Sequence, residues 1–287
     1  SHAIALIMSN AALRTGMKAT FDPEQRQVLA GGKVWTGYKS VWHFPASGTA
    51  VEDATGNGLS AEARNCTPAE GPFGPAVQVC DDSTRNQGNY IQNDVTKAHG
   101  VISTAYANEN LAGNLTLITW LRHPSEYDYY SHIWFNRTAS SSGGNDGFYV
   151  ELANNGLASS KWDRGLNIGR ASENKKITLG ANYNIMDNQW HQFVTVIDGK
   201  TWTVYVDGVK QGSMTSGANL TDNNLAVTLG NDADMNDCAF IGAFDEARIA
   251  TRAMSDAEVA TLYAADSGAF VQTYGEIEAV VSQEIDE

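Results

Sequence analysis

The feature that most constrains the fold of this chain is the alternation of apolar and polar residues in short runs between tight-turn signals. Four such runs are rich in β-branched and aromatic residues: 115–121, 147–152, 190–197 and 202–206. A period of two is typical of β-strands with one buried face. Asp198-Gly199 and Asp207-Gly208 separate the later runs, and Asp-Gly tolerates the positive φ angles of a two-residue hairpin turn. The pattern predicts antiparallel strands, with a meander of three strands from about residue 190 to beyond residue 209.

One segment has the signature of a helix. In "SDAEVATLYAA" (255–265), the Ser255 hydroxyl can accept a hydrogen bond from the Glu258 amide while the Glu258 carboxylate reaches back to the Ser255 amide. This arrangement is a capping box, which marks a helix start. Because strands and turns dominate the rest of the sequence, the expected fold class is all-β. It is a two-sheet antiparallel jelly-roll sandwich with one short C-terminal helix.

Composition and charge exclude some classes of function. The chain has 287 residues, of which 42% are apolar, and it carries seven Trp, eleven Tyr and nine Phe. This is enough apolar material for a packed core and unlike a disordered chain. The net charge of -14 argues against a nucleic-acid partner, because binding to a polyanion needs a basic surface. No apolar run approaches the length of a membrane-spanning helix, so membrane insertion is not expected.

Three cysteines leave the redox state open. Cys66 and Cys80 flank the loop of "CTPAEGPFGPAVQVC". A disulfide between them and two buried thiols are equally compatible with that arrangement. Cys238 is expected in the core, and no cysteine spacing resembles a zinc knuckle.

Three blocks of sequence together resemble a known family. They are "SVWHFPASGTAVEDATGNGLSA" (40–61), "DNQWHQFVTVIDGKTWTVYVDGVKQG" (187–212) and "FIGAFDEARIATRAMSDAEVATLY" (240–263). Their order and spacing are similar to those of the bacterial laminin-G-like domains of the concanavalin A-like lectin/glucanase superfamily. The resemblance covers residues 40–265 and implies a concanavalin A-like jelly roll. It is far less specific for function, because one fold hosts many functions.

The flanking segments are expected to lie outside this domain. "IALIMSNAALRTGMKATFD" (4–22) resembles the end of a domain of unknown function that precedes laminin-G-like modules in secreted or envelope-associated bacterial proteins. Residues 1–39 are therefore expected to be the tail of a preceding domain. "GAFVQTYGEIE" (268–278) resembles the exit strand of that architecture, so residues 266–287 are expected to form an exit strand and an acidic tail. The resemblance implies an extracellular or cell-envelope location.

The resemblance also implies a structural calcium ion at a sheet edge. In the family, the Asp of a block like "FDEARI" holds calcium together with the Asp and backbone oxygens of a loop like "DATGNG". The matching positions here are Asp245 and Asp53, with a carbonyl of Asn57 as a further ligand. Calcium takes six to eight hard oxygens in flexible geometry, which such a loop can supply.

An alternative for these acids needs no metal. Asp53 would form an Asx turn, Asp245 would point to solvent, and Glu246 would pair with Arg248 or Arg252. Exposed pairs of that kind contribute little to stability. The residues alone leave both interpretations open.

No catalytic pattern is found in the sequence. A retaining glycosidase needs two carboxyl groups about 5 Å apart, but Glu151 is the only acid in its strand run. Asp245 and Glu246 are adjacent, so regular strand alternation would point them to opposite faces. We therefore expect no enzyme activity, with a glycoside hydrolase as the less favoured alternative.

Aromatic residues near polar loops are the candidates for ligand binding. Trp134, Tyr149 and Trp162 lie in or beside expected strands, and Tyr129 belongs to the aromatic cluster "HPSEYDYYSHIWFNR" (123–137). Exposed rings can stack on the apolar faces of sugars while polar side chains bond the hydroxyls. The same residues could instead be core residues or a protein-contact patch.

The expected function is a non-catalytic carbohydrate-binding or adhesion module of a secreted or surface bacterial protein, with a structural calcium ion. Its partner would be a glycan or a surface protein. The alternative is a protein-interaction or structural domain without a sugar ligand.

Overall fold

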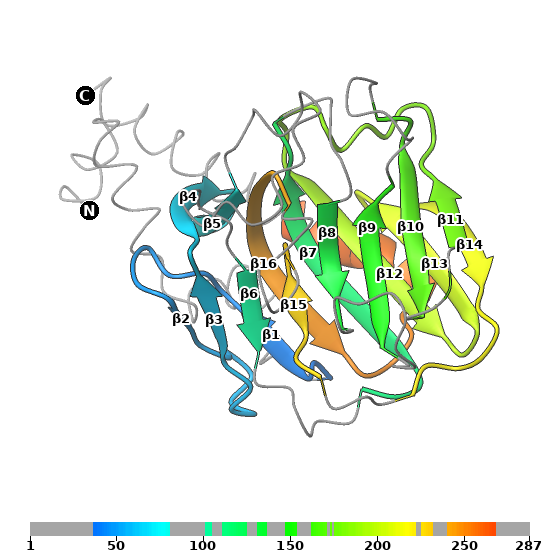
Figure 1. Cartoon of the computed structure of the whole chain (residues 1–287), viewed down its shortest axis with the longest axis horizontal. Coiled ribbons are helices and arrows are strands. Elements are labelled where there is room, and N and C mark those ends of the chain that lie inside the picture. The colour runs from blue at the N-terminus through cyan, green and yellow to red at the C-terminus, as the bar shows by residue number, and fades with distance from the viewer. Residues whose placement is uncertain are drawn as a thin grey trace, which may run out of the picture.

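Two antiparallel β-sheets packed face to face make up most of the molecule (Figure 1). The structure is a computed structural model that describes residues 37–80, 101–104, 111–124, 131–136, 147–153, 162–170, 173, 175–221, 225–231 and 240–267. The predicted all-β jelly-roll sandwich with one short helix is confirmed. The predicted N-terminal unit (1–39) and the exit strand and tail (266–287) lie almost entirely outside the described residues. No helix among the described residues is long and apolar enough to cross a membrane.

The first sheet, sheet A, has the strand order β14-β13-β12-β7-β16-β5-β4, and β1 also pairs with β16. Its strands are β1 (Ser40–Trp42), β4 (Thr67–Gly71), β5 (Gly74–Cys80), β7 (Leu115–Arg122), β12 (His191–Asp198), β13 (Thr201–Val206), β14 (Val209–Thr215) and β16 (Gly242–Ala250). The predicted meander is β12, β13 and β14, which pair in sequence order. Asp207 and Gly208 form the second turn with φ angles of 52° and 75°, as a type I′ hairpin turn requires.

The second sheet, sheet B, has the strand order β11-β10-β9-β8-β15-β6-β3-β2. Its strands are β2 (Ala50–Val51), β3 (Ala61–Arg64), β6 (Val101–Thr104), β8 (Ser131–Phe135), β9 (Phe148–Leu152), β10 (Gly165–Arg170), β11 (Lys175–Thr178) and β15 (Thr228–Leu229). Sheet B faces the viewer in Figure 1, and sheet A lies behind it.

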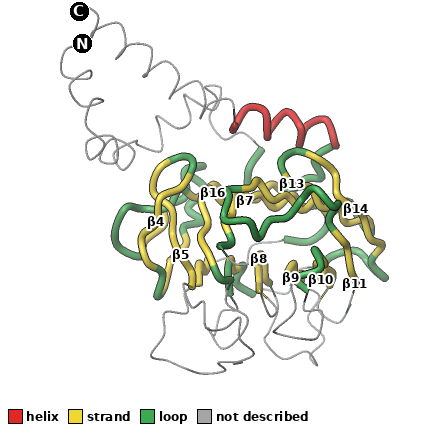
Figure 2. Tube along the Cα trace, turned by 90° about the horizontal axis from the view of Figure 1, so that it is seen from above, coloured by secondary structure: helices red, strands yellow, loops and turns green. Residues whose placement is uncertain are grey.

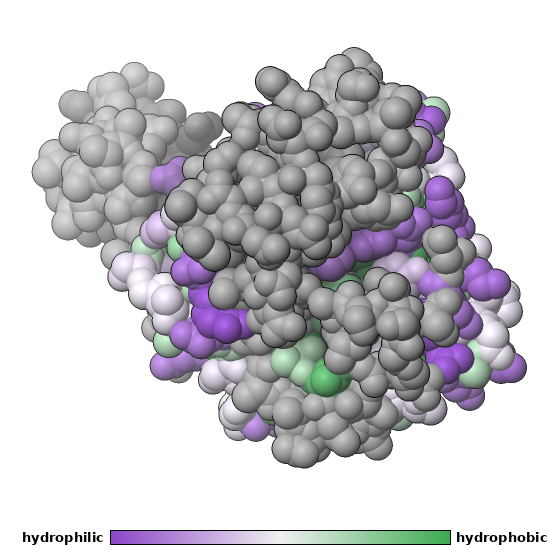
Figure 3. Space-filling model, viewed as in Figure 1, coloured by the Kyte–Doolittle hydropathy of each residue, from purple (hydrophilic) through white to green (hydrophobic). Residues whose placement is uncertain are grey.

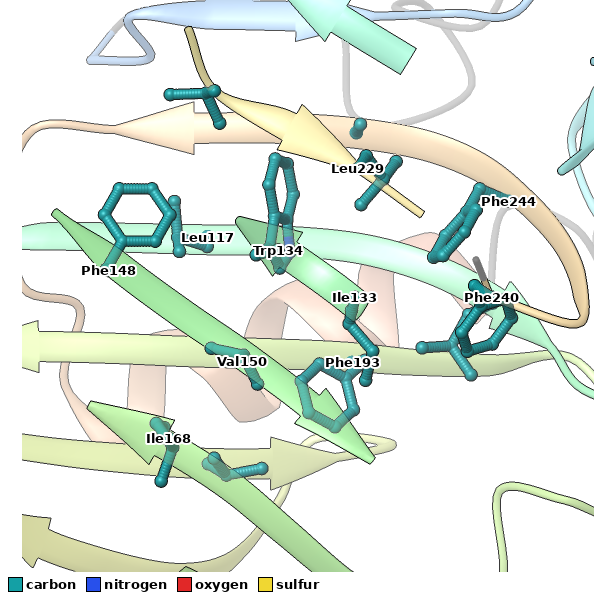
Figure 4. Close-up of a cluster of buried hydrophobic side chains, with 14 of the residues drawn as sticks. Leu117, Ile133, Trp134, Phe148, Val150, Ile168, Phe193, Leu229, Phe240 and Phe244 are labelled. Carbon is teal, nitrogen blue, oxygen red and sulfur yellow. The ribbon is translucent and has the colours of Figure 1, made fainter. Parts of the chain in front are cut away.

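The hydrophobic core fills the space between the two sheets (Figure 4). Trp134, Phe148 and Val150 of sheet B belong to the same buried cluster as Leu117 and Phe193 of sheet A, and none of these side chains has exposed surface. Alternation along each strand places these residues inside and leaves their neighbours on the outer faces.

The helix at residues 256–267 covers part of the outer face of sheet A (Figure 2). Its capping box is formed as predicted: the Ser255 amide donates to Glu258 Oε2 at 2.8 Å, and the Glu258 amide donates to Ser255 Oγ at 3.3 Å. Val259 packs in a second buried cluster with Ile118 and Tyr205 of the sheet. The helix is therefore held by its apolar face rather than by propensity alone.

A β-bulge in β16 accounts for the two adjacent acids in this buried strand. The pairing of β16 with β7 shifts between Asp245 and Ala247, and Glu246 has a φ of 53°. A bulge leaves one residue outside the ladder and re-aims its side chain. Both acids are buried, with exposed fractions of 0% for Asp245 and 2% for Glu246, so the metal-free alternative is wrong in placing Asp245 in solvent.

Arg248 connects Glu246 to the helix. Its Nη2 donates to Glu246 Oε2 at 3.2 Å, and its Nη1 donates to the two carboxylate oxygens of Asp266 at 3.2 and 3.0 Å. His43, which follows β1, places Nδ1 2.5 Å from Glu246 Oε1. Burial lowers the pKa of Arg248, but the carboxylates of Asp266 and Glu246 outweigh it and leave the pKa raised. These four residues, which we call the ion network, join three segments that lie far apart in the sequence.

We predict that Arg248→Met lowers the free energy of unfolding by about 3–5 kcal/mol, because it leaves two carboxylates buried without their cation. The matched control is Arg252→Met. Arg252 pairs with Glu258 at the surface, where both side chains are nearly half exposed, so its loss should cost less than about 1 kcal/mol. Urea denaturation of the two variants measures the difference, and equal losses would contradict a structural role for the ion network.

His191, the first residue of β12, lies between two carboxylates. Its Nδ1 is 2.7 Å from Asp207 Oδ2, and its Nε2 is 3.1 Å from Asp187 Oδ1. Burial lowers the pKa of His191, but the hydrogen bonds and charges of Asp207 and Asp187 outweigh it, so the pKa is raised above its usual 6.5. The charged imidazole therefore stabilises the folded state fully below the unfolded pKa, and this contribution is lost as the pH rises through the folded-state pKa.

We predict that His191→Gln destabilises the protein more at about pH 5.5 than at about pH 9, because only the protonated imidazole gains from both carboxylates. Thermal unfolding of both proteins across this range gives the comparison. Repeating it in an Asp187→Asn background should shrink the pH dependence. A difference that is constant with pH would show that the imidazole charge plays no part.

Candidate functional site

The outer face of sheet B carries a row of polar side chains. Val150 and Ile168 of β9 and β10 point into the core, so their neighbours lie on the other face. Strand register pairs His132 with Glu151 and Glu151 with Asn167. These three residues, which we call the polar row, come from three adjacent strands and are 5%, 6% and 6% exposed.

Glu151 organises the polar row. The Asn167 Nδ2 donates to Glu151 Oε1 at 3.0 Å, and the His132 Nε2 lies 3.0 Å from Glu151 Oε2. The two carboxylate oxygens thus contact neighbours from the two strands that flank β9: Asn167 on β10 and His132 on β8. The hydrogen bond from Asn167 to the carboxylate is of a strong type and, with the short contact to the imidazole, holds the three side chains close together.

Two atoms of the polar row lack a hydrogen-bond partner among the described residues. They are His132 Nδ1 and Asn167 Oδ1. Leaving a buried polar atom unpaired costs about 1–3 kcal/mol, so native proteins contain few of them and each calls for an explanation.

An aromatic row lies directly beside the polar row. Register pairs Phe135 with Tyr149 and Tyr149 with Gly169. The rings of His132 and Phe135 stack with centroids 4.3 Å apart and planes 20° apart, which connects the two rows. The Tyr149 hydroxyl donates to the Glu173 carbonyl. In Figure 3, which looks onto this sheet, hydrophilic described residues show between the grey ones.

Comparison with known sequences identifies the family. Residues 96–260 match the family described as "Concanavalin A-like lectin/glucanases superfamily". The chain belongs to this laminin G-like family. The resemblance to this family is thereby confirmed for residues 96–260, which contain the second block and most of the third, whereas the first block (40–61) precedes the matched residues. No curated protein matches the chain.

Solved structures with the same fold are distant in sequence. The chain is similar to the binding domain of Paraclostridial Mosquitocidal Protein 1, with a TM-score of 0.56, 15% identity and coverage of 80% of this chain and 52% of that one. It is also similar to domain 4 of AbnA, a GH43 extracellular arabinanase from Geobacillus stearothermophilus in complex with arabinotriose (TM-score 0.52, 18% identity, coverage 79% and 98%). A third neighbour is the binding domain of Botulinum Neurotoxin DC in complex with SialylT (TM-score 0.56, 11% identity, coverage 82% and 52%). The chain thus spans about half of each toxin binding domain, and these likenesses show the fold alone.

The aromatic residues expected to face a ligand fall into three groups. Trp134 and Trp162 are 0% and 8% exposed and belong to the core cluster. The expectation that they face a ligand is therefore wrong for both. The Trp162 Nε1 donates to the Gly165 carbonyl at 2.8 Å. Tyr149 lies in the aromatic row and is 3% exposed. Tyr129 lies outside the described residues.

The polar row itself was missed by sequence reasoning, which considered Glu151 only as a single acid in its strand run. A signal was present, because Glu151 in "FYVEL" and Asn167 in "GLNIG" are single polar residues within apolar strand runs. Their grouping depends on the pairing of β8, β9 and β10, which no local pattern gives. Glycosidases use two acids around one bond, but Glu151 is paired with an amide and an imidazole, and the carboxylate of Glu173 accepts hydrogen bonds from the amides of Gly217 and Arg170.

Cys66 and Cys80 are not bonded to each other in the structure, unlike in the disulfide alternative. Thr67 lies opposite Gln78 in the β4–β5 pair, and continuing this register places Cys66 opposite Val79. Adjacent residues of a strand project to opposite faces, so the two side chains point away from each other. The Cys66 Sγ donates to the Arg64 carbonyl at 3.5 Å, and Cys80 is buried.

Asp53 is surrounded by hydrogen-bond donors. Its Oδ1 accepts from the amides of Val41 and Thr55 at 3.1 and 3.0 Å, and its Oδ2 accepts from the Leu59 amide at 3.1 Å. The Thr55 hydroxyl lies 2.8 Å from both oxygens. These N–H and O–H donors stabilise the Asp53 carboxylate, and their partial positive charges would repel a calcium ion placed against it. Asp53 therefore folds its own loop against β1, as in the Asx-turn alternative.

Asp245 has a different set of neighbours. Its Oδ2 accepts from the Phe73 amide at 3.0 Å in the turn between β4 and β5, and a Cβ at Gly71 would overlap its carboxylate. The Asn57 Nδ2 donates to the carbonyls of Tyr38 and Lys39. Among the described residues there is no group of three or more His, Cys, Asp or Glu that could hold a metal ion. The described residues thus do not fit the implied calcium site, and the calcium dependence of stability tests this expectation.

We predict that Asp53→Ala lowers the free energy of unfolding by about 2–3 kcal/mol, because three amides lose their acceptor. The loss should be the same with calcium and with a chelator. Glu52→Ala removes the neighbouring exposed carboxylate and should change stability by less than about 0.5 kcal/mol. A calcium-dependent rise in the melting temperature of the parent that vanishes in Asp53→Ala would contradict this account and support the calcium site.

Proposed function

We propose that this chain is a non-catalytic carbohydrate-binding module of a secreted or surface protein, and that the outer face of sheet B holds the sugar. The observation that carries the proposal is the polar row beside the aromatic row. Sugar sites combine a few positioned polar groups with aromatic surface, because a sugar ring has apolar faces and a rim of hydroxyls. His132, Glu151 and Asn167 supply the polar groups, and Phe135 and Tyr149, which are 2% and 3% exposed, lie beside them on the same face.

The family and the structural neighbours support the same class of function. Two of the neighbours are described as complexes with arabinotriose and with SialylT. Another is the binding domain of Botulinum neurotoxin DC in complex with rat synaptotagmin II. A surface protein is therefore the second candidate partner.

Catalysis is not part of the proposal. Glu151 accepts a hydrogen bond from Asn167 and lies 3.0 Å from the His132 imidazole within its own face, which suits a fixed recognition group. A general acid or a nucleophile for glycoside cleavage would need a second carboxyl group across the scissile bond.

We predict that the full chain binds a subset of immobilised glycans without releasing new reducing ends, and that Glu151→Gln weakens the binding by about tenfold. A glutamine replaces one of the two carboxylate oxygens by an NH2 group, which would face either the amide of Asn167 or the imidazole of His132 and lose that contact. A glycan array followed by calorimetry on the best ligand measures both effects.

The matched control is Glu62→Gln on β3. Glu62 is an exposed acid on the same sheet, so its loss tests the general effect of charge. Failure to bind any glycan would overturn the proposal, and release of reducing ends would replace it with a hydrolase. Binding that Glu151→Gln leaves unchanged would place the sugar elsewhere.

A further inference from the structure

We propose that Arg122 and Trp190 form a second binding site, on the outer face of sheet A, for the carboxylate of an acidic sugar unit such as a uronic or sialic acid. The choice of a sugar rests on the proposed carbohydrate-binding function, whereas the requirement for an anion rests on the surroundings of Arg122 alone. The site lies on the opposite side of the sandwich from the polar row, because Arg122 belongs to β7 of sheet A.

Strand alternation places Arg122, the last residue of β7, on the outer face of sheet A. Leu121 belongs to the core cluster, whereas Trp120 stacks on Tyr263 of the helix with ring centroids 6.0 Å apart. Arg122 comes two residues after Trp120 in the same strand, so it shares the outer face. Its side chain is half-buried, in contrast to the fully buried residues that precede it in β7.

Trp190 lies beside Arg122 across the strand pair. His191 pairs with Leu121, and continuing this register by one residue places Trp190 opposite Arg122. The guanidinium carbon of Arg122 lies over the indole ring, 5.2 Å from the ring centroid. Trp190 is also half-buried, so both side chains are open in part to solvent. An arginine held over an aromatic ring keeps the N–H groups of its edge for a ligand.

The guanidinium of Arg122 has no hydrogen-bond or ion-pair partner among the described residues. Its neighbours on this face are Trp190 on one side, Ala243 of β16 on the other and Trp120 along its own strand. None of these side chains carries a hydrogen-bond acceptor. A guanidinium has five N–H donors and one positive charge, so its accessible edge is left to water or to a ligand.

Nearby carboxylates are committed to other cations. Asp187 and Asp207 lie on either side of His191, the residue after Trp190, at 3.1 and 2.7 Å. Asp266 accepts hydrogen bonds from Arg248. The chain has 33 acidic and 19 basic residues, so a partly exposed arginine that pairs with no acid stands out against this excess of carboxylates.

A carboxylate on a sugar ring suits this site. A planar guanidinium can donate two parallel hydrogen bonds to the two oxygens of a carboxylate, and such charge-assisted bonds are stronger than neutral ones. Phe73, which is half-buried, contacts Trp120 with ring centroids 5.2 Å apart. Phe73 and Trp190 thus offer aromatic surface to the apolar face of a sugar. The net charge of -14 repels anions at long range, but physiological salt screens this repulsion beyond about 8 Å.

The test is calorimetry of the full chain with matched sugars that differ in charge. Digalacturonic acid is compared with its methyl ester, and sialyllactose with lactose. We expect each acid to bind about five- to tenfold more tightly than its uncharged counterpart, with the preference falling as salt is added. Equal affinities for the acid and its uncharged counterpart would overturn the proposal while leaving the carbohydrate-binding function intact. A glutamate peptide that binds as tightly as the acidic sugars would also overturn it, because the ligand would then be an acidic peptide.

Variants assign the preference to Arg122. Arg122→Met removes the charge and keeps an unbranched chain over Trp190, so it should abolish the preference for acids and leave the affinity for uncharged sugars unchanged. Arg122→Lys keeps the charge but loses the paired donors, so it should retain only part of the preference. The matched control is Lys200→Met, which removes an exposed cation at the opposite end of β12 from Trp190 and should leave the preference unchanged. Equal effects of Arg122→Met and Lys200→Met would show that overall charge, and not this site, determines the preference.

The outcomes distinguish this site from the polar row. Glu151→Gln lies on the other outer face and should leave the preference for acids that depends on Arg122 in place. A preference that survives Arg122→Met would refute the second site and retain the carbohydrate-binding function. The absence of any glycan binding by the parent chain would refute both. Thermal unfolding of each variant confirms that it is folded before its affinity is interpreted.

Discussion

The buried ion pairs of Arg248 are the interaction on which the arrangement of sheet A depends. Burying charge is expensive unless each group is paired and hydrogen-bonded. Arg248 meets this requirement with Glu246 on its own strand and Asp266 at the end of the helix, and Glu246 in turn contacts His43 beside β1. An early segment, the central strand β16 and the helix are thereby positioned together. A well-packed apolar cluster could stabilise these segments equally well, but it would define their relative positions less sharply.

This arrangement has a consequence for function. The helix and the Tyr205 and Ile118 side chains beneath it close part of the outer face of sheet A. The outer face of sheet B instead carries polar and aromatic side chains in two aligned rows. In the core between the sheets, Trp134 and its neighbours contribute packing alone. Strand alternation makes both outer faces possible, because each strand turns one set of side chains into the core and the other set outward. On sheet A outward side chains such as Ile118 pack against the helix, and on sheet B they form the polar and aromatic rows.

Local signals in the sequence were sufficient for much of the fold. Asp207-Gly208 specified a turn with positive φ angles, and the Ser255/Glu258 pair specified the helix start. Both depend on residues that are close in sequence. The pairing of Glu246 with Arg248 was one of the sequence-based alternatives and is confirmed. The burial of Glu246 could not be predicted, because it depends on a bulge and on Asp266, which shares the same guanidinium. The candidate site was equally beyond local reasoning, since Glu151 acquires its role only when β8 and β10 pair on either side of it. Trp134 and Trp162 were misjudged because proximity to polar loops says nothing about which face of a strand a ring occupies.

In the proposed site, the sugar lies against the row formed by His132, Glu151 and Asn167 on the outer face of sheet B. Nitrogen-15 NMR of the asparagine side-chain amides tests this directly, with the Asn167 signal assigned by its absence from Asn167→Leu. We expect the Asn167 resonance to shift when a bound glycan is added, because its amide donates to Glu151 within that row, while Asn57, which lies outside the row and whose amide donates to the Tyr38 and Lys39 carbonyls, stays unchanged. A glycan that binds without moving the Asn167 resonance would contradict this placement.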